Sequence, residues 1–305
     1  MMNHNKATME QDGFEGRFYT SSDYEQTCII VLNEKGEQSP FAKAMIKWVL
    51  DNDCNALYFS YGASKGEGGI CDFPIDQVEC ALAWLHRKGV RKIGIMGIGY
   101  GGNLALTAAC LLSNITLTIA FSAIDFVTEG FTGKKGSEVP AGKSCYSWRG
   151  EEIPWQPFYL KGEEHKQLKL DESRKYRELR SLGIYRSMEQ KTELKEGVML
   201  PIEMIQGALY IFAAADDSIW DSAHFAWRMK KRLEEKGSRG IYKVHIYRLG
   251  THLLIPESMF NLTVPLAGQL MTKVFQSGRK HGKECRKNRE DVDEKIRLAI
   301  RKWKG

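Results

Sequence analysis

The sequence predicts an α/β fold in which a mostly parallel central sheet carries helices on both faces and receives one long insertion. Three observations lead to this prediction. Short apolar runs alternate with helical patterns, the runs are almost continuously hydrophobic, and the alternation breaks only between residues 122 and 207. Continuous hydrophobic runs are typical of strands that are covered on both faces. We expect the 305 residues to form a single domain.

Four buried strands are expected in the first part of the chain, each bounded by turn residues. Their ranges are Cys28–Leu32, Ala56–Ser60, Lys92–Met96 and Leu117–Phe121. The clearest helix lies between the second and third strands, where Pro74–Lys88 begins with proline, repeats apolar residues at helical spacing and is followed by Gly89. Because strands and helices alternate, the strands are expected to run parallel.

Residues 122–207 interrupt this pattern with a charged stretch in which no clear strand is visible. The stretch is too long for an ordinary loop, so we expect either a cap with helices of its own, with the best helix candidate at Asp171–Leu182, or a mobile lid. The alternation then resumes with a strand at Ala208–Phe212, a helix at Trp220–Lys236, a strand at Tyr242–Tyr247 and a helix from Pro256 onward.

A cluster of glycines follows the third strand and precedes a helix expected at Asn103–Leu112. Its sequence, Gly97-Ile98-Gly99-Tyr100-Gly101-Gly102, fits two motifs. As G-x-G-x-x-G, glycines 97, 99 and 102 match a dinucleotide-binding fingerprint, with Asp125 near the place of the ribose-binding acid. As G-x-S-x-G with the serine replaced, the cluster is a nucleophile elbow of the α/β-hydrolase fold, in which Gly99 keeps the turn but lacks a nucleophile.

Downstream residues favour the elbow. A dinucleotide fingerprint usually follows the first strand of its domain, whereas this cluster follows the third. A hydrolase triad runs in the order nucleophile, acid, histidine, with the last two on loops after later strands. Asp216 and Asp217 follow the strand at 208–212, and His252 follows the strand at 242–247. Either carboxylate could orient the imidazole as a general base.

These motifs resemble the catalytic α/β-hydrolase domain of the acyl-CoA thioesterases and bile acid-CoA:amino acid N-acyltransferases. The resemblance covers most of residues 14–265 and rests on Phe73-Pro74-Ile75-Asp76, Ile95–Gly102, Pro201–Ile205, Asp216-Asp217 with Trp220 and Ser222, and Gly250–Leu254. It implies a nucleophile at position 99, Asp217 as acid and His252 as base, in attack on a thioester or ester carbonyl. The oxyanion would be held by the backbone N–H of Tyr100 and by a second N–H near Asn33 or Glu34.

Gly99 departs from the family, which has serine or cysteine at this position. Because no acyl-enzyme can form without that side chain, we expect hydrolase or acyltransferase activity to be absent or strongly reduced. A bound water could act in its place; Ser122 and Cys110 are other nucleophiles, but neither lies at an elbow. Two alternatives stay open: a pseudoenzyme that binds an acyl or ester ligand, and an oxidoreductase that binds a dinucleotide through glycines 97, 99 and 102.

The charge of the chain does not indicate a nucleic-acid partner. The net charge of +6 comes entirely from residues 279–305, which hold eleven Lys/Arg against five Asp/Glu. Apolar residues recur there at helical spacing, so we expect a C-terminal helix with a basic solvated face. No apolar run is long enough to span a membrane, and the polar N-terminus does not resemble a secretory signal, which favours a cytoplasmic location.

The cysteines do not indicate a metal site. All seven are scattered and none forms a C-x-x-C pair, so we interpret them as reduced thiols. No metal and no cofactor are therefore expected. The expected partner is a small-molecule acyl thioester or ester, and the sequence leaves the acyl group, the acceptor and the oligomeric state open.

Overall fold

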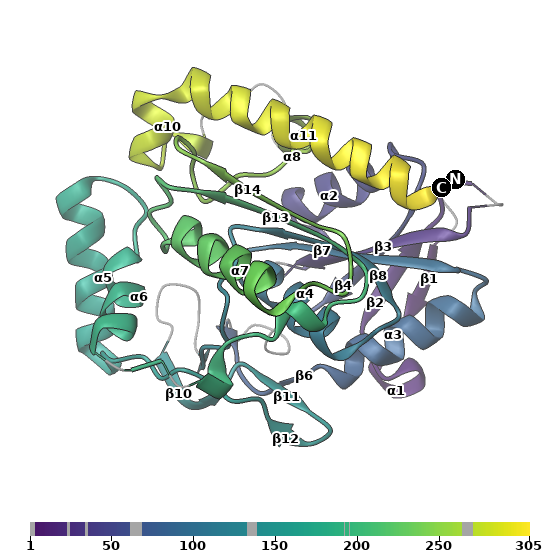
Figure 1. Ribbon diagram of the computed structural model, residues 1–305, viewed down its shortest axis with the longest axis horizontal. Coiled ribbons are helices and arrows are strands. Elements are labelled where there is room, and N and C mark those ends of the chain that lie inside the picture. The colour runs from purple at the N-terminus through teal and green to yellow at the C-terminus, as the bar shows by residue number, and fades with distance from the viewer. Residues whose placement is uncertain are drawn as a thin grey trace.

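The computed structural model describes residues 4–22, 25–33, 36–61, 69–132, 139–191, 193–194, 196–263 and 271–305. Over these residues, eight strands form the central sheet in the order β1-β2-β4-β3-β7-β8-β13-β14 (Figure 1). The strands are β1 His4–Ala7, β2 Gly16–Tyr19, β3 Thr27–Asn33, β4 Asn55–Ser60, β7 Lys92–Ile98, β8 Ile115–Phe121, β13 Ala208–Ala214 and β14 Tyr242–Tyr247. All neighbours from β4 to β14 are parallel, whereas β1 pairs antiparallel with β2 and β2 pairs antiparallel with β4. The predicted mostly parallel sheet is confirmed.

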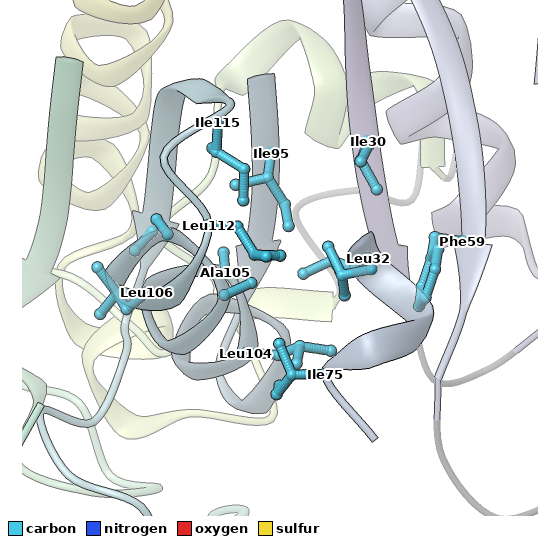
Figure 2. Close-up of a cluster of buried hydrophobic side chains, with 14 of the residues drawn as sticks. Ile30, Leu32, Phe59, Ile75, Ile95, Leu104, Ala105, Leu106, Leu112 and Ile115 are labelled. Atoms are coloured by element: carbon cyan, nitrogen blue, oxygen red, sulfur yellow. The ribbon is translucent and has the colours of Figure 1, made fainter. Parts of the chain in front are cut away.

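Helices cover both faces of the sheet. One face carries α3 (Asp76–Arg87), α4 (Tyr100–Leu111) and α7 (Ser222–Lys236), and the other carries α2 (Pro40–Leu50), α8 (Glu257–Thr263) and α11 (Gly282–Lys304). Successive residues of a strand point to opposite faces. Ile30 of β3 accordingly belongs to the same buried cluster as Leu104 of α4 (Figure 2), whereas Ile29 belongs to the cluster of α2 and α11. Covering on both faces explains why the strands are hydrophobic at nearly every position.

The helix boundaries differ from the predicted ones for local reasons. The helix expected from Pro74 starts at Asp76, because Phe73–Pro74 forms the short strand β6. The helix expected from Asn103 already starts at Tyr100, directly after the glycine turn. At the C-terminus, α10 (Gln276–Lys280) precedes α11, which buries Val292, Ile296 and Ala299 against the body.

The inserted residues 122–207 contain strands that the sequence analysis did not predict. β9 (Glu129–Thr132) and β10 (Val139–Ser144) form a sheet with β5 (Gly69–Ile70), and β11 (Tyr146–Trp148) and β12 (Glu151–Glu152) form another with β6. These strands are short, and their partners lie far upstream in the chain: β9 pairs with Gly69–Ile70 and β11 with Phe73–Pro74. No local periodicity therefore marks them.

Two helices and two short 3₁₀ turns complete the insertion. They are α5 (Gly162–Tyr176), α6 (Leu182–Lys191), η1 (Glu196–Val198) and η2 (Ile202–Met204). The helix predicted at Asp171–Leu182, the best candidate within the insertion, is therefore wrong in its bounds. Arg177, in the left-handed region at φ 52°, ends α5 inside the predicted range. The next helix, α6, begins at Leu182, the last residue of the predicted range.

We predict that Glu203→Gln lowers the free energy of unfolding by about 1–2 kcal/mol at neutral pH and by much less in acid. Arg232 of α7 donates Nε–H and Nη2–H bonds to this carboxylate, the second at 2.6 Å, and these bonds lower the pKa of Glu203. A carboxyl whose pKa is lower in the folded chain stabilises it above the unfolded pKa, and this contribution is lost as the pH falls through the folded value.

Urea unfolding at about pH 7 and about pH 3 measures the effect. Glu234→Gln is the matched control, because Glu234 lies on α7 and makes only an exposed pair with Lys230 at 3.7 Å. A loss of stability in Glu203→Gln that is equal at both pH values would contradict the prediction.

Candidate active site

A cavity of about 500 Å³ opens at the carboxyl ends of the central strands. Its floor includes Leu32 and Asn33 at the end of β3, the turn at Gly99 and Tyr100, and His252 after β14. The inserted helices contribute His165, Ile184 and Tyr185 to the lining of the cavity. Most of the lining is apolar, and much of it is aromatic: Phe41, Tyr61, Tyr100, Phe131, Phe158, Tyr185, Trp220 and Phe275. Carboxyl ends of parallel strands are the usual place for a site in an open α/β sheet.

The glycine cluster forms a sharp turn between β7 and α4. Gly99 has φ 61° and ψ −122°, a conformation that is strained for residues other than glycine. Its N–H donates to the Phe121 carbonyl of β8 at 2.9 Å, and its own carbonyl accepts the N–H of Asn103 at 2.9 Å. A Cβ at Gly97 would lie 2.3 Å from the carbonyl of Gly101, so the strand and the helix approach each other too closely for any side chain there.

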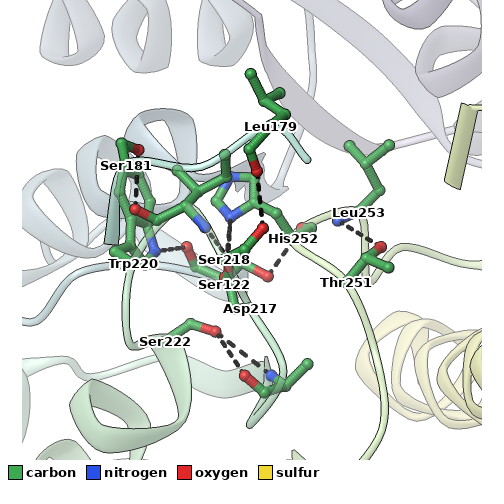
Figure 3. A network of polar contacts seen from close by, with 12 residues as sticks. Ser122, Leu179, Ser181, Asp217, Ser218, Trp220, Ser222, Thr251, His252 and Leu253 are labelled. Atoms are coloured by element: carbon green, nitrogen blue, oxygen red, sulfur yellow. Dashed lines mark hydrogen bonds and ion pairs between the residues drawn. The ribbon is translucent and has the colours of Figure 1, made fainter. Parts of the chain in front are cut away.

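His252 and Asp217 form a hydrogen-bonded pair (Figure 3). Nδ1 of His252 lies 2.9 Å from Oδ2 and 3.2 Å from Oδ1 of the carboxylate. The Asp217 side chain is fully buried, and its Oδ1 also accepts the Ile219 N–H at 2.9 Å. A carboxylate that accepts the Nδ1 proton leaves Nε2 as the acceptor of the ring. Of the two acids that the sequence left open, Asp216 lies elsewhere and accepts a bond from Ser277 Oγ at 3.0 Å.

The free side of the imidazole ring faces residue 99. A Cβ built on Gly99 would lie 3.1 Å from Nε2 of His252 and 3.5 Å from the Trp220 ring. The structure therefore brings together positions 99, 217 and 252, which the sequence grouped as nucleophile position, acid and base. A carbon atom at 3.1 Å is a tight contact, so the ring must shift by a few tenths of an ångström to admit a side chain at residue 99.

Trp220 and Ser122 hold the histidine loop in place. The Trp220 ring meets His252 edge to face with centroids 4.9 Å apart, and its Nε1–H donates to the Ser122 carbonyl at 2.8 Å. The Ser122 hydroxyl donates to the His252 carbonyl at 3.0 Å. Ser122, considered as a substitute nucleophile, is thus a buried link between loops. Cys110 lines a separate, smaller cavity, and burial raises the pKa of its thiol.

Two of the three residues expected at the oxyanion hole, Tyr100 and Asn33, lie within the described residues. Tyr100 is the first residue of α4, so its N–H is one of the helix donors without an intrahelical acceptor, at the positive end of the helix dipole. Asn33 ends β3, is buried and lines the cavity. Glu34 lies outside the described residues. Burial raises the pKa of the Tyr100 phenol, whose oxygen lies 3.0 Å from that of Tyr185.

Asp125 does not fit the ribose-binding role of the dinucleotide alternative. Its carboxylate is buried and receives two bonds from Arg228 of α7, at 2.5 and 2.7 Å. Arg228 also donates to Glu189 of α6 at 2.5 Å, so this ion pair joins the inserted segment to the body of the fold. Within the described ranges, no group of three or more His, Cys, Asp or Glu could hold a metal ion. Among the described helices, none has the length and apolar character needed to cross a membrane.

Comparisons with known proteins identify the fold and a family. Residues 74–287 match the family model described as BAAT / Acyl-CoA thioester hydrolase C terminal. No curated protein matches the chain significantly. The esterase Pf2001 of Pyrococcus furiosus aligns with a TM-score of 0.54 and 13% identity, over 100% of this chain and 98% of that one.

Two metagenomic proteins align similarly. MGS-M1, an α/β-hydrolase enzyme from a Medee basin deep-sea metagenome library, has a TM-score of 0.53 and 13% identity, with 99% and 96% of the two chains covered. A dienelactone hydrolase-like promiscuous phosphotriesterase from metagenomic libraries has a TM-score of 0.52 and 11% identity, with 99% and 98% covered. These likenesses confirm the predicted α/β-hydrolase fold and do not favour the dinucleotide-binding alternative.

We predict that alanine is tolerated at residue 99 but not at residue 97. Gly97→Ala should lower the free energy of unfolding by about 3 kcal/mol or more, because its Cβ would overlap the Gly101 backbone. Gly99→Ala should cost about 1–2 kcal/mol, the strain of a side chain at positive φ, because its Cβ points into the cavity. Urea unfolding of both variants measures this, and equal losses would contradict the assignment of the turn.

Proposed function

The chain belongs to the BAAT / acyl-CoA thioester hydrolase C-terminal family, and on this premise we propose that it binds a small acyl thioester or ester over Gly99 but forms no acyl-enzyme. One observation carries the proposal: the Cα–Cβ direction of residue 99 points at Nε2 of His252, 3.1 Å away, yet the residue is glycine. In the arrangement of an elbow, acid and base, this is the direction of the nucleophile. Turnover through a covalent intermediate is accordingly absent or strongly reduced.

Each remaining part of the site has a proposed role. Asp217 orients His252, and His252 serves as base toward position 99. The N–H of Tyr100 receives the carbonyl oxygen of the ligand, together with a second N–H contributed near Asn33 or Glu34. The apolar, aromatic lining of the cavity favours an acyl group over a charged one at this end of the ligand.

We propose that residues 122–207 act as a cap that selects the acyl group, within a single domain. Helices α5 and α6 contribute His165, Ile184 and Tyr185 to the cavity wall opposite the glycine turn. The Arg228–Glu189 ion pair and the packing of Tyr185 on Trp220, with ring centroids 5.0 Å apart, support a fixed position of α6 over the site. The seven cysteines are free thiols, which fits a reducing compartment such as the cytoplasm.

Serine at residue 99 should restore covalent chemistry. We expect Gly99→Ser to hydrolyse p-nitrophenyl hexanoate about 10²–10³ times faster than the native chain, because His252 then has a hydroxyl to deprotonate. The variant should release a burst of p-nitrophenol and show an acyl adduct in its intact mass. Gly99→Ser/His252→Ala is the matched control and should lose the gain. A serine variant that binds the ester but never becomes acylated would contradict the proposed triad geometry.

Ligand binding should depend on the cavity and not on the missing nucleophile. A non-hydrolysable ketone analogue of the hexanoyl ester, at about 100 times its Kd, should stabilise the native chain by about 2.7 kcal/mol, seen as a rise in Tm. Ile219→Trp should abolish the rise, since Ile219 lines the cavity and is only half-buried. Leu298→Trp, at an exposed position of α11, is the control and should bind as the native chain does. Binding that survives in Ile219→Trp would place the ligand elsewhere.

A further inference from the structure

A side chain at residue 99 would point into the space beside Nε2 of His252. A Cβ built on Gly99 would lie 3.1 Å from Nε2, and because residue 99 carries no such atom, a water in van der Waals contact with its Cα can hydrogen-bond to Nε2. Gly99 and His252 both line the cavity of about 500 Å³, so this space is continuous with the place of the ligand. The oxygen of a water molecule in this space can therefore take the role that a side-chain oxygen of residue 99 would have.

We infer that His252 activates a water molecule in the space that a side chain of residue 99 would fill, and that this water hydrolyses the bound acyl thioester or ester in one displacement, without an acyl-enzyme. The inference rests on the proposed function for its ligand and goes beyond it by assigning the chain an activity of its own.

The imidazole is held as a base pointing at this space. Asp217 fixes Nδ1 through contacts of 2.9 and 3.2 Å, and the carboxylate is itself held by the Ile219 N–H. Trp220 packs against the ring in a T-shaped contact with centroids 4.9 Å apart, and its own position is set by the bond to Ser122. Because both contacts persist without a side chain at residue 99, Nε2 keeps its direction and remains an acceptor.

The surroundings make a water at this place reactive. Trp220 is almost fully buried, and the lining of the cavity is largely apolar, so a water on Nε2 lies in a mainly apolar environment. Charge that develops on the carbonyl oxygen meets the N–H of Tyr100 at the N-terminus of α4. Base and oxyanion donor flank the turn, so a water on Nε2 has a carbonyl carbon within reach when the oxygen binds at Tyr100.

The proposed reaction balances without another reactant. The water oxygen forms a bond to the carbonyl carbon while one water proton passes to Nε2. The tetrahedral intermediate then collapses, the C–S or C–O bond breaks, and the proton on Nε2 passes to the leaving thiolate or alkoxide. The products are a carboxylic acid and a thiol or alcohol, and no residue of the chain is acylated.

Alanine at residue 99 separates this mechanism from background hydrolysis. The methyl group takes the space of the water but supplies no nucleophile, so Gly99→Ala should hydrolyse p-nitrophenyl hexanoate at least about tenfold more slowly than the native chain. His252→Ala should fall to the same level, and Leu298→Ala, on the exposed face of α11, should not change the rate. The native chain should show linear progress without a burst, and its intact mass should show no acyl adduct.

The ketone analogue distinguishes failure of the inference from failure of the proposed function. If native and Gly99→Ala chains both bind the analogue and hydrolyse the ester equally fast, the water mechanism is wrong while the binding function stands. An acyl adduct on the native chain would also overturn the mechanism, since a side chain would then be the nucleophile. If no chain binds the analogue, the proposed function falls and the inference falls with it.

Discussion

The close approach of β7 and α4 at the glycine turn is the constraint on which the site depends. Gly97 and Gly101 lie backbone against backbone, so the chain must turn within one residue, and Gly99 meets this demand with φ 61°. The turn ties into the neighbouring strand through the Phe121 carbonyl and starts α4 with its first N–H groups directed at the cavity. The place of the N-terminus of α4 at the cavity thus follows from packing between a strand and a helix.

Links between loops carry this constraint to the acid and the base. Ser122 follows β8, Trp220 follows β13 and His252 follows β14, and two hydrogen bonds join the three loops in a row. Since the strands are parallel neighbours in the sheet, their carboxyl ends lie side by side, and short polar side chains suffice to connect them. The arrangement of the site is therefore built by the order of the strands as much as by the residues that face the ligand.

The central part of this design can be predicted from the sequence and its periphery cannot. Strands β3, β4, β7, β8 and β13 are largely buried, so each carries a local hydrophobic signal, and the elbow and His252 follow directly from strand ends. β1 is a short edge strand with the short β2 beside it, and β5 and β9 pair only across a long stretch of chain, so none of these four carries such a signal. Asp216 and Asp217 follow the same strand end, and only their contacts tell them apart, with His252 for Asp217 and with Ser277 for Asp216.

The Asp217–His252 pair has a structural reason to be present even with glycine at residue 99. The Asp217 carboxylate is fully buried, and without His252 it would keep the bond from the Ile219 backbone N–H but lose its side-chain partner, which would leave a poorly compensated charge in the interior. Glycine at residue 99, in turn, relieves the strain that a side chain at positive φ imposes on an elbow. Stability thus favours both the glycine and the histidine–aspartate pair, whether or not a reaction occurs. What stability does not account for is the position of Nε2 beside the space over Gly99, and for this reason the catalytic inference rests on that position and not on the persistence of the pair.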